Sequence, residues 1–131
     1  NEIVSFADGY PCLLIGQSSL DGLNERLASP VRMDRFRPNF VFTGGQPHVE
    51  DSFDSFLIGE VMFRAVKPCA RCVLITIDQQ TGIKGPEPLK TLAGYRNIGN
   101  KIMFGQNLIH HGNGLIKVGD EISVQSWKEK S

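Results

Sequence analysis

The sequence predicts a mainly β fold, in which short strands form a closed or nearly closed antiparallel β-barrel with about two short helices. Short runs of β-branched and aromatic residues recur at close spacing along the chain. The 14 glycines and 7 prolines among the 131 residues supply turns between these runs. Only two stretches have helical spacing, so alternating βαβ units are not expected.

The expected strands share β-branched or aromatic residues and have turn residues at their ends. In chain order they cover residues 2–6, 12–15, 39–43, two runs within 56–66 separated at Gly59, 72–78, 104–109, 114–118 and 121–124. A first helix is predicted from three leucines at helical spacing, with the serines at 18–19 as its cap and its end before Pro30. A second, short helix is expected over residues 89–95.

Length and charge indicate one globular domain over residues 1–131. The 14 basic and 14 acidic residues cancel, so no overall field favours nucleic acid or an anionic membrane as a partner. No apolar run approaches the roughly 20 residues of a membrane helix, and the start resembles neither a signal peptide nor an anchor. Because the chain starts without Met and within an apparent strand, we expect it to be excised from a longer protein.

Three cysteines, Cys12, Cys69 and Cys72, form an odd set with one close pair. This pattern is not typical of a secreted disulfide framework, so a cytoplasmic location is expected. Around the pair, Pro68 argues against a central strand, and a lysine and an arginine flank the thiols. The segment 67–72 is therefore expected to be an exposed loop with a positive potential, which favours the thiolate form.

Spacing alone leaves several roles open for this pair. A structural zinc site needs four ligands, and only His48, His110 and His111 could add to the cysteines. A thioredoxin-like redox pair would lie at the start of a helix, whereas Cys72 is expected to open a strand. The thiols could also be two ordinary cysteines at the rim of a barrel.

Other polar groups are expected to be solvated. Glu50, Asp51 and Asp54 cluster in a polar loop, where carboxylates usually face water. His110 and His111 would be neighbours on a strand and point to opposite faces, which disfavours joint binding of one metal ion.

Seven collinear segments, which span nearly the whole chain, form one recognisable pattern. They cover residues 36–41, 50–59, 69–78, 87–92, 95–96, 104–107 and 116–120. Together they resemble the MOSC domain, the C-terminal domain of molybdenum-cofactor sulfurases. The likeness is strongest to the branch that contains the mitochondrial amidoxime-reducing component and its bacterial relatives.

The resemblance implies a MOSC-like barrel that binds the molybdenum cofactor (molybdopterin) in an oxidoreductase for N-hydroxylated substrates. It implies that Cys72, the cysteine after Arg71, is the catalytic residue and the metal ligand, since a soft thiolate suits this metal. It places Arg37, Asn39, Arg71 and Asp8 at the cofactor. A surface ion pair remains an alternative for Arg37, and a strand-initiating role remains one for Asn39.

One part of the pattern departs from the family. Relatives often continue the position of Asp8 with Ser or Thr, but Gly9 and Tyr10 follow here. Hydroxyl contacts from that loop are therefore not expected.

The resemblance also implies partners. These are an N-terminal barrel-like domain of the same protein, a small-molecule substrate and a separate electron-donor protein, because no ferredoxin-like cysteine cluster follows Trp127. The alternative functions are a cofactor or sulfur carrier that holds a persulfide on Cys72 and a zinc-stabilised interaction module. Pyridoxal phosphate is associated with MOSC domains as a group, but no lysine here has a context that supports a Schiff base.

Overall fold

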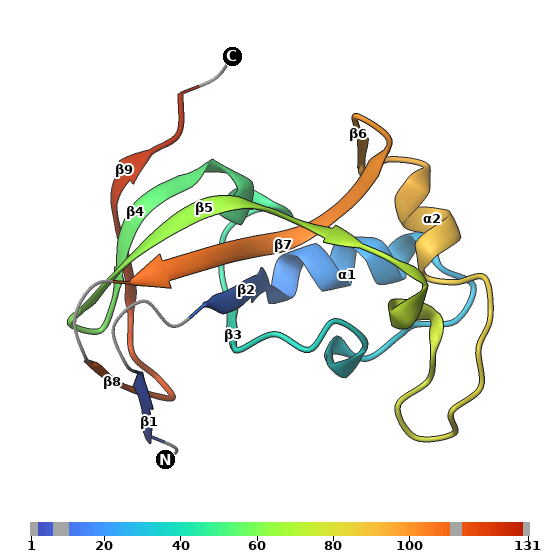
Figure 1. Cartoon of the computed structure of the whole chain (residues 1–131), viewed down its shortest axis with the longest axis horizontal. Helices are drawn as coiled ribbons and strands as arrows, with labels where there is room; N and C mark the ends of the chain where they lie inside the picture. The colour runs from blue at the N-terminus through green and yellow to red at the C-terminus, as the bar shows by residue number, and fades with distance from the viewer. Residues whose placement is uncertain (1–2, 7–10, 111–113, 130–131) are drawn as a thin grey trace.

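The computed structural model describes residues 3–6, 11–110 and 114–129, and within them the chain consists mainly of strands (Figure 1). The strands are β1 (Ile3–Phe6), β2 (Cys12–Gly16), β3 (Phe40–Phe42), β4 (Phe53–Ile58), β5 (Val61–Arg71), β6 (Asn97–Ile98), β7 (Lys101–His110), β8 (Gly114–Lys117) and β9 (Ile122–Trp127). The helices are α1 (Gln17–Arg26) and α2 (Leu89–Ala93), and the short 3-10 helices are η1 (Met33–Arg35), η2 (Val49–Ser52) and η3 (Val73–Thr76). No helix among these residues is long and apolar enough to cross a bilayer.

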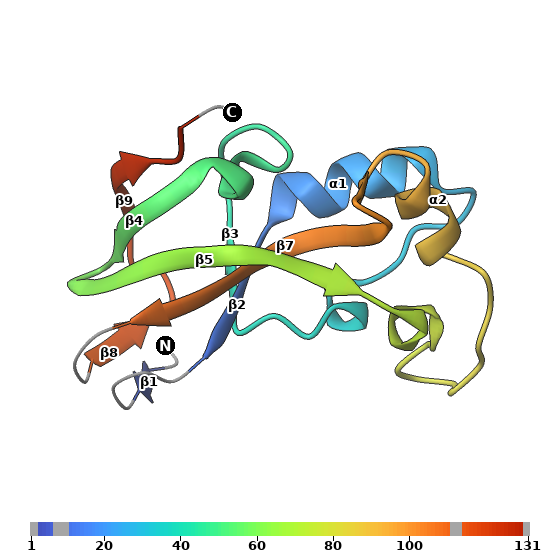
Figure 2. The ribbon, with the colours of Figure 1, turned by 45° about the horizontal axis from the view of Figure 1, so that its top comes forward.

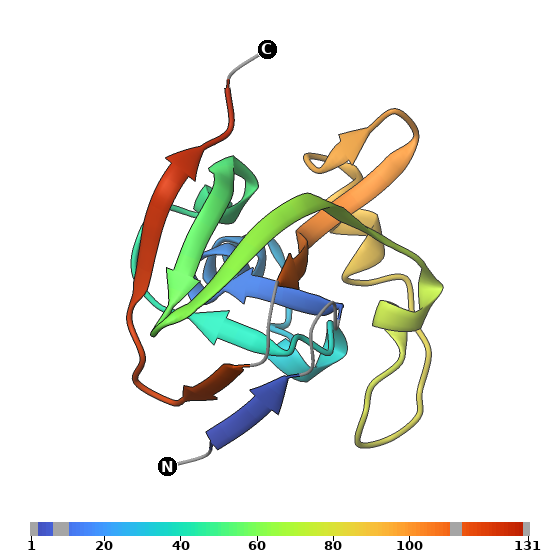
Figure 3. The same ribbon diagram turned by 60° about the vertical axis from the view of Figure 1, so that its left-hand side comes forward.

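The main sheet has the strand order β3-β2-β7-β5-β4-β9, with β6 beside β7. Its described pairs are antiparallel except β2 with β3, which are parallel. The sheet curls, and the long strands β5 and β7 cross its middle (Figure 2 and Figure 3). A separate pair, β1 with β8, lies beside it. The predicted mainly β barrel with two short helices is thus confirmed, in the form of a curled mixed sheet.

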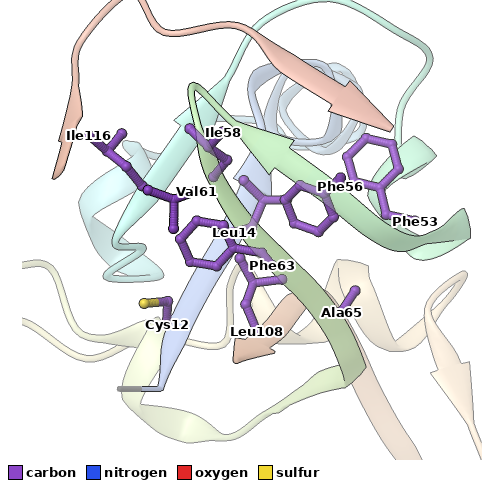
Figure 4. Packing of buried hydrophobic residues seen from close by; sticks show 10 residues of the cluster. All are labelled: Cys12, Leu14, Phe53, Phe56, Ile58, Val61, Phe63, Ala65, Leu108 and Ile116. Atoms are coloured by element: carbon purple, nitrogen blue, oxygen red, sulfur yellow. The ribbon is translucent and has the colours of Figure 1, made fainter. Parts of the chain in front are cut away.

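Two clusters of buried residues fill the fold. The first lies within the curl of the sheet (Figure 4) and contains Cys12, Leu14, Phe53, Phe56, Ile58, Val61, Phe63, Ala65, Leu108 and Ile116. In β5 every second side chain from Val61 to Ala65 is buried, as the period of a half-buried strand requires. The second cluster contains Ile15, Leu20, Leu23, Phe36, Ile75, Leu92 and Phe104. It fixes two side chains, Phe36 and Ile75, that flank the candidate site.

Two predictions for the segment around Pro68 are wrong. Residues 67–71 are the end of β5 rather than a loop, and Cys72 does not begin a strand, because η3 follows it. Among the described strands, β4 pairs with β5 only as far as Arg64. Beyond Arg64, β5 pairs with β7, and two register shifts interrupt that pairing. Pro68 is tolerated because it lies at such an irregular edge, where a missing N–H costs little. The segment after Cys72 turns instead of extending, since Ile75 is buried in the second cluster.

Gly105 allows β7 to pass close to β2. Its φ is +89°, and a Cβ atom there would lie 2.9 Å from Cγ1 of Ile15 and 3.2 Å from the carbonyl oxygen of Leu14. We expect Gly105→Ala to lower the free energy of unfolding by about 2 to 4 kcal/mol, through backbone strain and overpacking. Urea unfolding measures the loss. Gly82→Ala is the control, because Gly82 has φ +73° with nothing within 4 Å, and equal losses from both changes would contradict the steric argument.

Candidate functional site

Cys72 directly follows the C-terminal end of β5, where the strand gives way to η3. Its thiol is exposed, Cys69 within β5 is half-buried, and Cys12 is buried in the first core cluster. Burial raises the pKa of the Cys12 thiol to about 11, so this thiol stays protonated at neutral pH. Of the three sulfur atoms, that of Cys72 is therefore the most accessible for binding or reaction.

Arg71 precedes Cys72 and joins three parts of the chain. Its Nε donates to the carbonyl oxygen of Phe104 at 2.9 Å, and its Nη1 donates to that of Phe36 at 3.1 Å. Its Cζ lies 5.2 Å from the centre of the Phe36 ring. The remaining nitrogen, Nη2, is buried without a hydrogen-bond partner. Burial lowers the pKa of Arg71, and the nearby thiols of Cys69 and Cys72 oppose that effect.

Arg37 and Asn39 follow Phe36, so the bond from Arg71 brings their segment to the end of β5. Arg37 is exposed, has φ 51°, and its Nη2 donates to Oε1 of Gln79 at 3.4 Å. The Oδ1 atom of Asn39 accepts from the backbone N–H of Leu13 at 2.7 Å, and the Asn39 N–H donates to the Leu13 carbonyl at 2.9 Å. Asn39 thus starts the β2–β3 pair, which is the alternative role considered for it.

Asn39 also lines a cavity of about 720 Å³ between β3 and the connection from β8 to β9. Its apolar lining includes Leu14, Ile58 and Ile116. Cys72, Arg71 and Arg37 are not among its lining residues, so this cavity is separate from the end of β5. Asp8, the remaining predicted site residue, lies outside the described residues.

Arg35 is a site residue that the sequence did not indicate. Its Nη1 donates to the carbonyl oxygen of Ile75 at 3.2 Å, and its Nη2 lies 3.5 Å from Oδ2 of Asp78. Backbone N–H groups of residues 80–81 and, more weakly, Arg35 hold the pKa of the Asp78 carboxyl below its usual value. Arg71 therefore binds the carbonyl of Phe36, directly after η1, and Arg35 of η1 binds the carbonyl of Ile75 in η3. The two arginines thus connect the segment around η1 with the segment around Cys72.

Glu50 is buried, and the expectation that it faces solvent is wrong. Its Oε2 accepts from the Gly16 N–H at 2.9 Å, and Ser19 Oγ lies 3.0 Å from Oε1 and 2.8 Å from Oε2. The N-cap of α1 is Gly16 rather than the predicted serines, and Ser19 lies inside the helix. The carboxylate thus replaces a side-chain cap at the start of α1.

Asp51 and Asp54 are half-buried and also have partners. Asp51 accepts from Nη2 of Arg96 and from Nε2 of Gln106, both at 2.7 Å. Asp54 accepts from Ser126 Oγ at 3.0 Å. All three carboxylates therefore hold elements of the fold together.

His110 is also buried, contrary to the predicted solvated pair, because its position in β7 faces the core beside Phe63, with ring centres 5.2 Å apart. His111 lies outside the described residues. In the part of the chain that the structure describes, no three or more His, Cys, Asp or Glu side chains form a group that could hold a metal ion. A zinc site thus receives no support from these residues.

His48 makes stability depend on pH. Its ring nitrogens are buried without partners, and burial, followed by the charge of Arg96, lowers its pKa from 6.5 to about 4. As the pH falls, the unfolded chain therefore binds a proton at His48 before the folded chain does. The stability that depends on a neutral His48 ring is complete above pH 6.5 and is lost as the pH falls toward 4. We expect the wild type to lose about 2 kcal/mol more than His48→Gln between those pH values, as measured by urea unfolding. Equal losses would contradict this assignment.

Comparisons with known proteins agree on one family. The model of the family described as MOSC domain matches residues 1–123. Mitochondrial amidoxime-reducing component 1 of Homo sapiens is 39% identical over 128 residues, which cover 91% of this chain and 38% of that protein. Molybdenum cofactor sulfurase of Oryza sativa subsp. japonica is 40% identical over 113 residues, which cover 78% of this chain and 14% of that protein. The chain thus spans well under half the length of these relatives.

A solved structure supports the same fold. The crystal structure of YiiM from Geobacillus stearothermophilus superposes with a TM-score of 0.66 at 17% identity, over 94% of this chain and 60% of that chain. At this identity the likeness concerns the fold alone.

Proposed function

This chain belongs to the MOSC domain family, and from that membership we propose that it binds the molybdenum cofactor through Cys72 in an oxidoreductase that reduces N-hydroxylated substrates. The observation that carries the proposal is the exposed thiol of Cys72 beside the partly buried guanidinium of Arg71. Relatives named for amidoxime reduction supply the reaction class.

The residues at the end of β5 fit such a group. Cys72 offers a soft sulfur ligand at an exposed position. Arg71 retains an unused N–H for an anionic oxygen, and the exposed fork of Arg37 can bind a second one. Asn39 and Asp8 belong to the proposed set through the family resemblance alone, because Asn39 lines the separate cavity and Asp8 lies outside the described residues. When bound, the cofactor would supply the redox chemistry, while these side chains bind and orient it.

The chain is proposed to act as one domain of a longer protein. In that arrangement an N-terminal domain completes the cofactor site, and a separate protein delivers electrons. The accessible position of Cys72 supports the first idea, because its exposed side chain leaves room for a second domain to cover the site. The cytoplasmic location stays a prediction, and several relatives are named for mitochondria.

Elemental analysis tests the proposal directly. The chain is expressed with its natural flanking sequence, purified without chelators, and analysed for molybdenum and zinc. We expect molybdenum near one atom per chain, and reduction of an N-hydroxylated amidine when an electron donor is added. Stoichiometric zinc bound by both Cys69 and Cys72 would refute the proposal and select the zinc-stabilised module.

A sulfur carrier is the second candidate, because the chain is also 40% identical to a molybdenum cofactor sulfurase. In that function the exposed Cys72 would hold a persulfide. Mass spectrometry of the peptide that contains Cys72 would then show one added sulfur atom, removable by a thiol reductant, in protein that contains no molybdenum.

A further inference from the structure

We propose that Arg35 is a positioning residue for Cys72, because it holds in place the turn that begins at that cysteine. The inference rests partly on the proposed function, since it assigns a residue that keeps the proposed metal ligand in position. It goes further because Arg35 is none of the proposed cofactor contacts and acts on Cys72 through the backbone of Ile75.

One residue, Ile75, links Arg35 to Cys72. The backbone N–H of Ile75 donates to the carbonyl oxygen of Cys72 at 3.3 Å. The carbonyl oxygen of Ile75 accepts from Nη1 of Arg35 at 3.2 Å. A displacement of Ile75 would therefore pass to the Cys72 carbonyl and to the backbone that carries the thiol.

Arg35 holds this turn from outside it. The carbonyl oxygens of residues 72–76 accept hydrogen bonds, in chain order, from Ile75, Thr76, Ile77, Arg35 and Gly85. Apart from Arg35, these donors lie within residues 75–85, so they can move together with the turn. Among the described residues, Arg35 is thus the one donor that ties these carbonyls to a distant part of the sequence.

Arg35 itself has a fixed position. Its side chain is 15% exposed, and its Nη2 lies 3.5 Å from Oδ2 of Asp78. The next residue, Phe36, is buried in the second core cluster, and its carbonyl oxygen accepts from Nη1 of Arg71 at 3.1 Å. Residues on both sides of Cys72 are therefore hydrogen-bonded to adjacent positions of one segment that the core anchors.

The test compares Arg35→Met with Arg35→Lys in the chain with its natural flanking sequence. Methionine keeps most of the apolar stem but has no donor, whereas lysine can still donate to the Ile75 carbonyl. The matched control is Arg32→Met, because Arg32 is exposed and lies directly before the same short helix, η1.

Amide hydrogen exchange measures the hold on the turn without any cofactor. We expect the Ile75 N–H, which bonds to Cys72, to exchange about tenfold faster in Arg35→Met than in the wild type. Arg35→Lys should stay within about threefold of the wild-type rate, and Arg32→Met should match it. Melting temperatures check the fold of each variant. An unchanged Ile75 rate in Arg35→Met would overturn the proposal.

Steady-state kinetics separate positioning from a purely structural effect. In full-length protein that carries molybdenum, Arg35→Met is expected to lower kcat for an N-hydroxylated amidine about tenfold, with KM changed by about twofold or less. The reason is that Arg35 acts on the metal ligand and not on the substrate. Arg35→Lys should restore most of kcat. A kcat that lysine does not restore, or a loss carried by KM alone, would overturn the proposal.

A measurement on the wild type does not depend on these variants. Contacts with Ile75 and Asp78 should slow the rotation of the Arg35 guanidinium, so its Nη protons should give resolved signals in ¹H–¹⁵N spectra. The exposed Arg32 should give averaged signals. Averaged signals from both arginines would also overturn the proposal.

Molybdenum content separates this inference from the proposed function. A wild-type protein without molybdenum, in which Arg35→Met still speeds exchange at Ile75, would remove the cofactor function and leave the positioning role standing. Arg35→Met protein that carries molybdenum, with wild-type exchange and wild-type kcat, would remove the role of Arg35 and leave the function standing.

Discussion

Cys72→Ser in the full-length protein is expected to abolish reduction of N-hydroxylated substrates and to strip most of the bound molybdenum. The serine hydroxyl is a hard, weakly acidic donor and a poor replacement for a soft thiolate. We expect activity to fall at least about 100-fold, as is usual when a residue at the centre of the reaction is removed. The melting temperature should hardly change, because the side chain is exposed at the end of β5. Metal analysis and a steady-state assay measure the two losses.

Cys69→Ser is the matched control, because Cys69 lies three residues before Cys72, within β5. Cys69 is half-buried, and its sulfur makes a 3.8 Å contact with the neighbouring carbonyl of Ala70. We expect this variant to keep most of its metal and activity. If both substitutions removed metal and activity equally, the single-ligand model would fail, and the pair would have to act together in zinc or redox chemistry.

Glu50→Ala is expected to cause the largest loss of stability, about 3 to 5 kcal/mol. The carboxylate is fully buried and accepts hydrogen bonds from the Gly16 N–H and the Ser19 hydroxyl. Ser19 Oγ also accepts from the backbone N–H of His48, so the substitution leaves several buried polar groups short of partners. Urea unfolding, followed by circular dichroism, gives the change in free energy.

Glu60→Ala is the control for this prediction, because Glu60 is the same residue type at an exposed position in the turn between β4 and β5. We expect a change within about 0.5 kcal/mol. A comparably small loss from Glu50→Ala would mean that water or a rearranged loop satisfies the donors, and that the carboxylate does not hold η2 against α1.

Much of the fold was predictable because strand and helix periods are local properties of the sequence. The leucines of α1 and the two strands hinged at Gly59 follow directly from spacing and turn residues. The conformation of segment 72–78 was not predictable from the sequence, although the segment is rich in β-branched residues. Its conformation is decided by where Ile75 is buried, which is a tertiary contact that no local pattern contains.

The candidate site was also predictable from the sequence only in part. The pair of cysteines and the adjacent arginine could be found from spacing and from the family resemblance. The role of Arg35 could not, because in the sequence it resembles Arg32, which is exposed and forms only a 3.5 Å ion pair with Asp34. The burial of Glu50 could not be predicted for a similar reason, since its partners lie more than thirty positions away in the sequence.

The pairing of β5 also determines how rigidly Cys72 is held. At Phe63 and Arg64 the strand pairs with neighbours on both sides, whereas from Ala65 onward its described partner is β7 alone. Local opening near Cys72 would therefore cost only part of the global unfolding free energy, and amide hydrogen exchange should quicken along the strand toward that end. Because Cys72 directly follows this weakly paired end of β5, the register shifts, and not the phenylalanine core, would take up a small displacement of its sulfur atom.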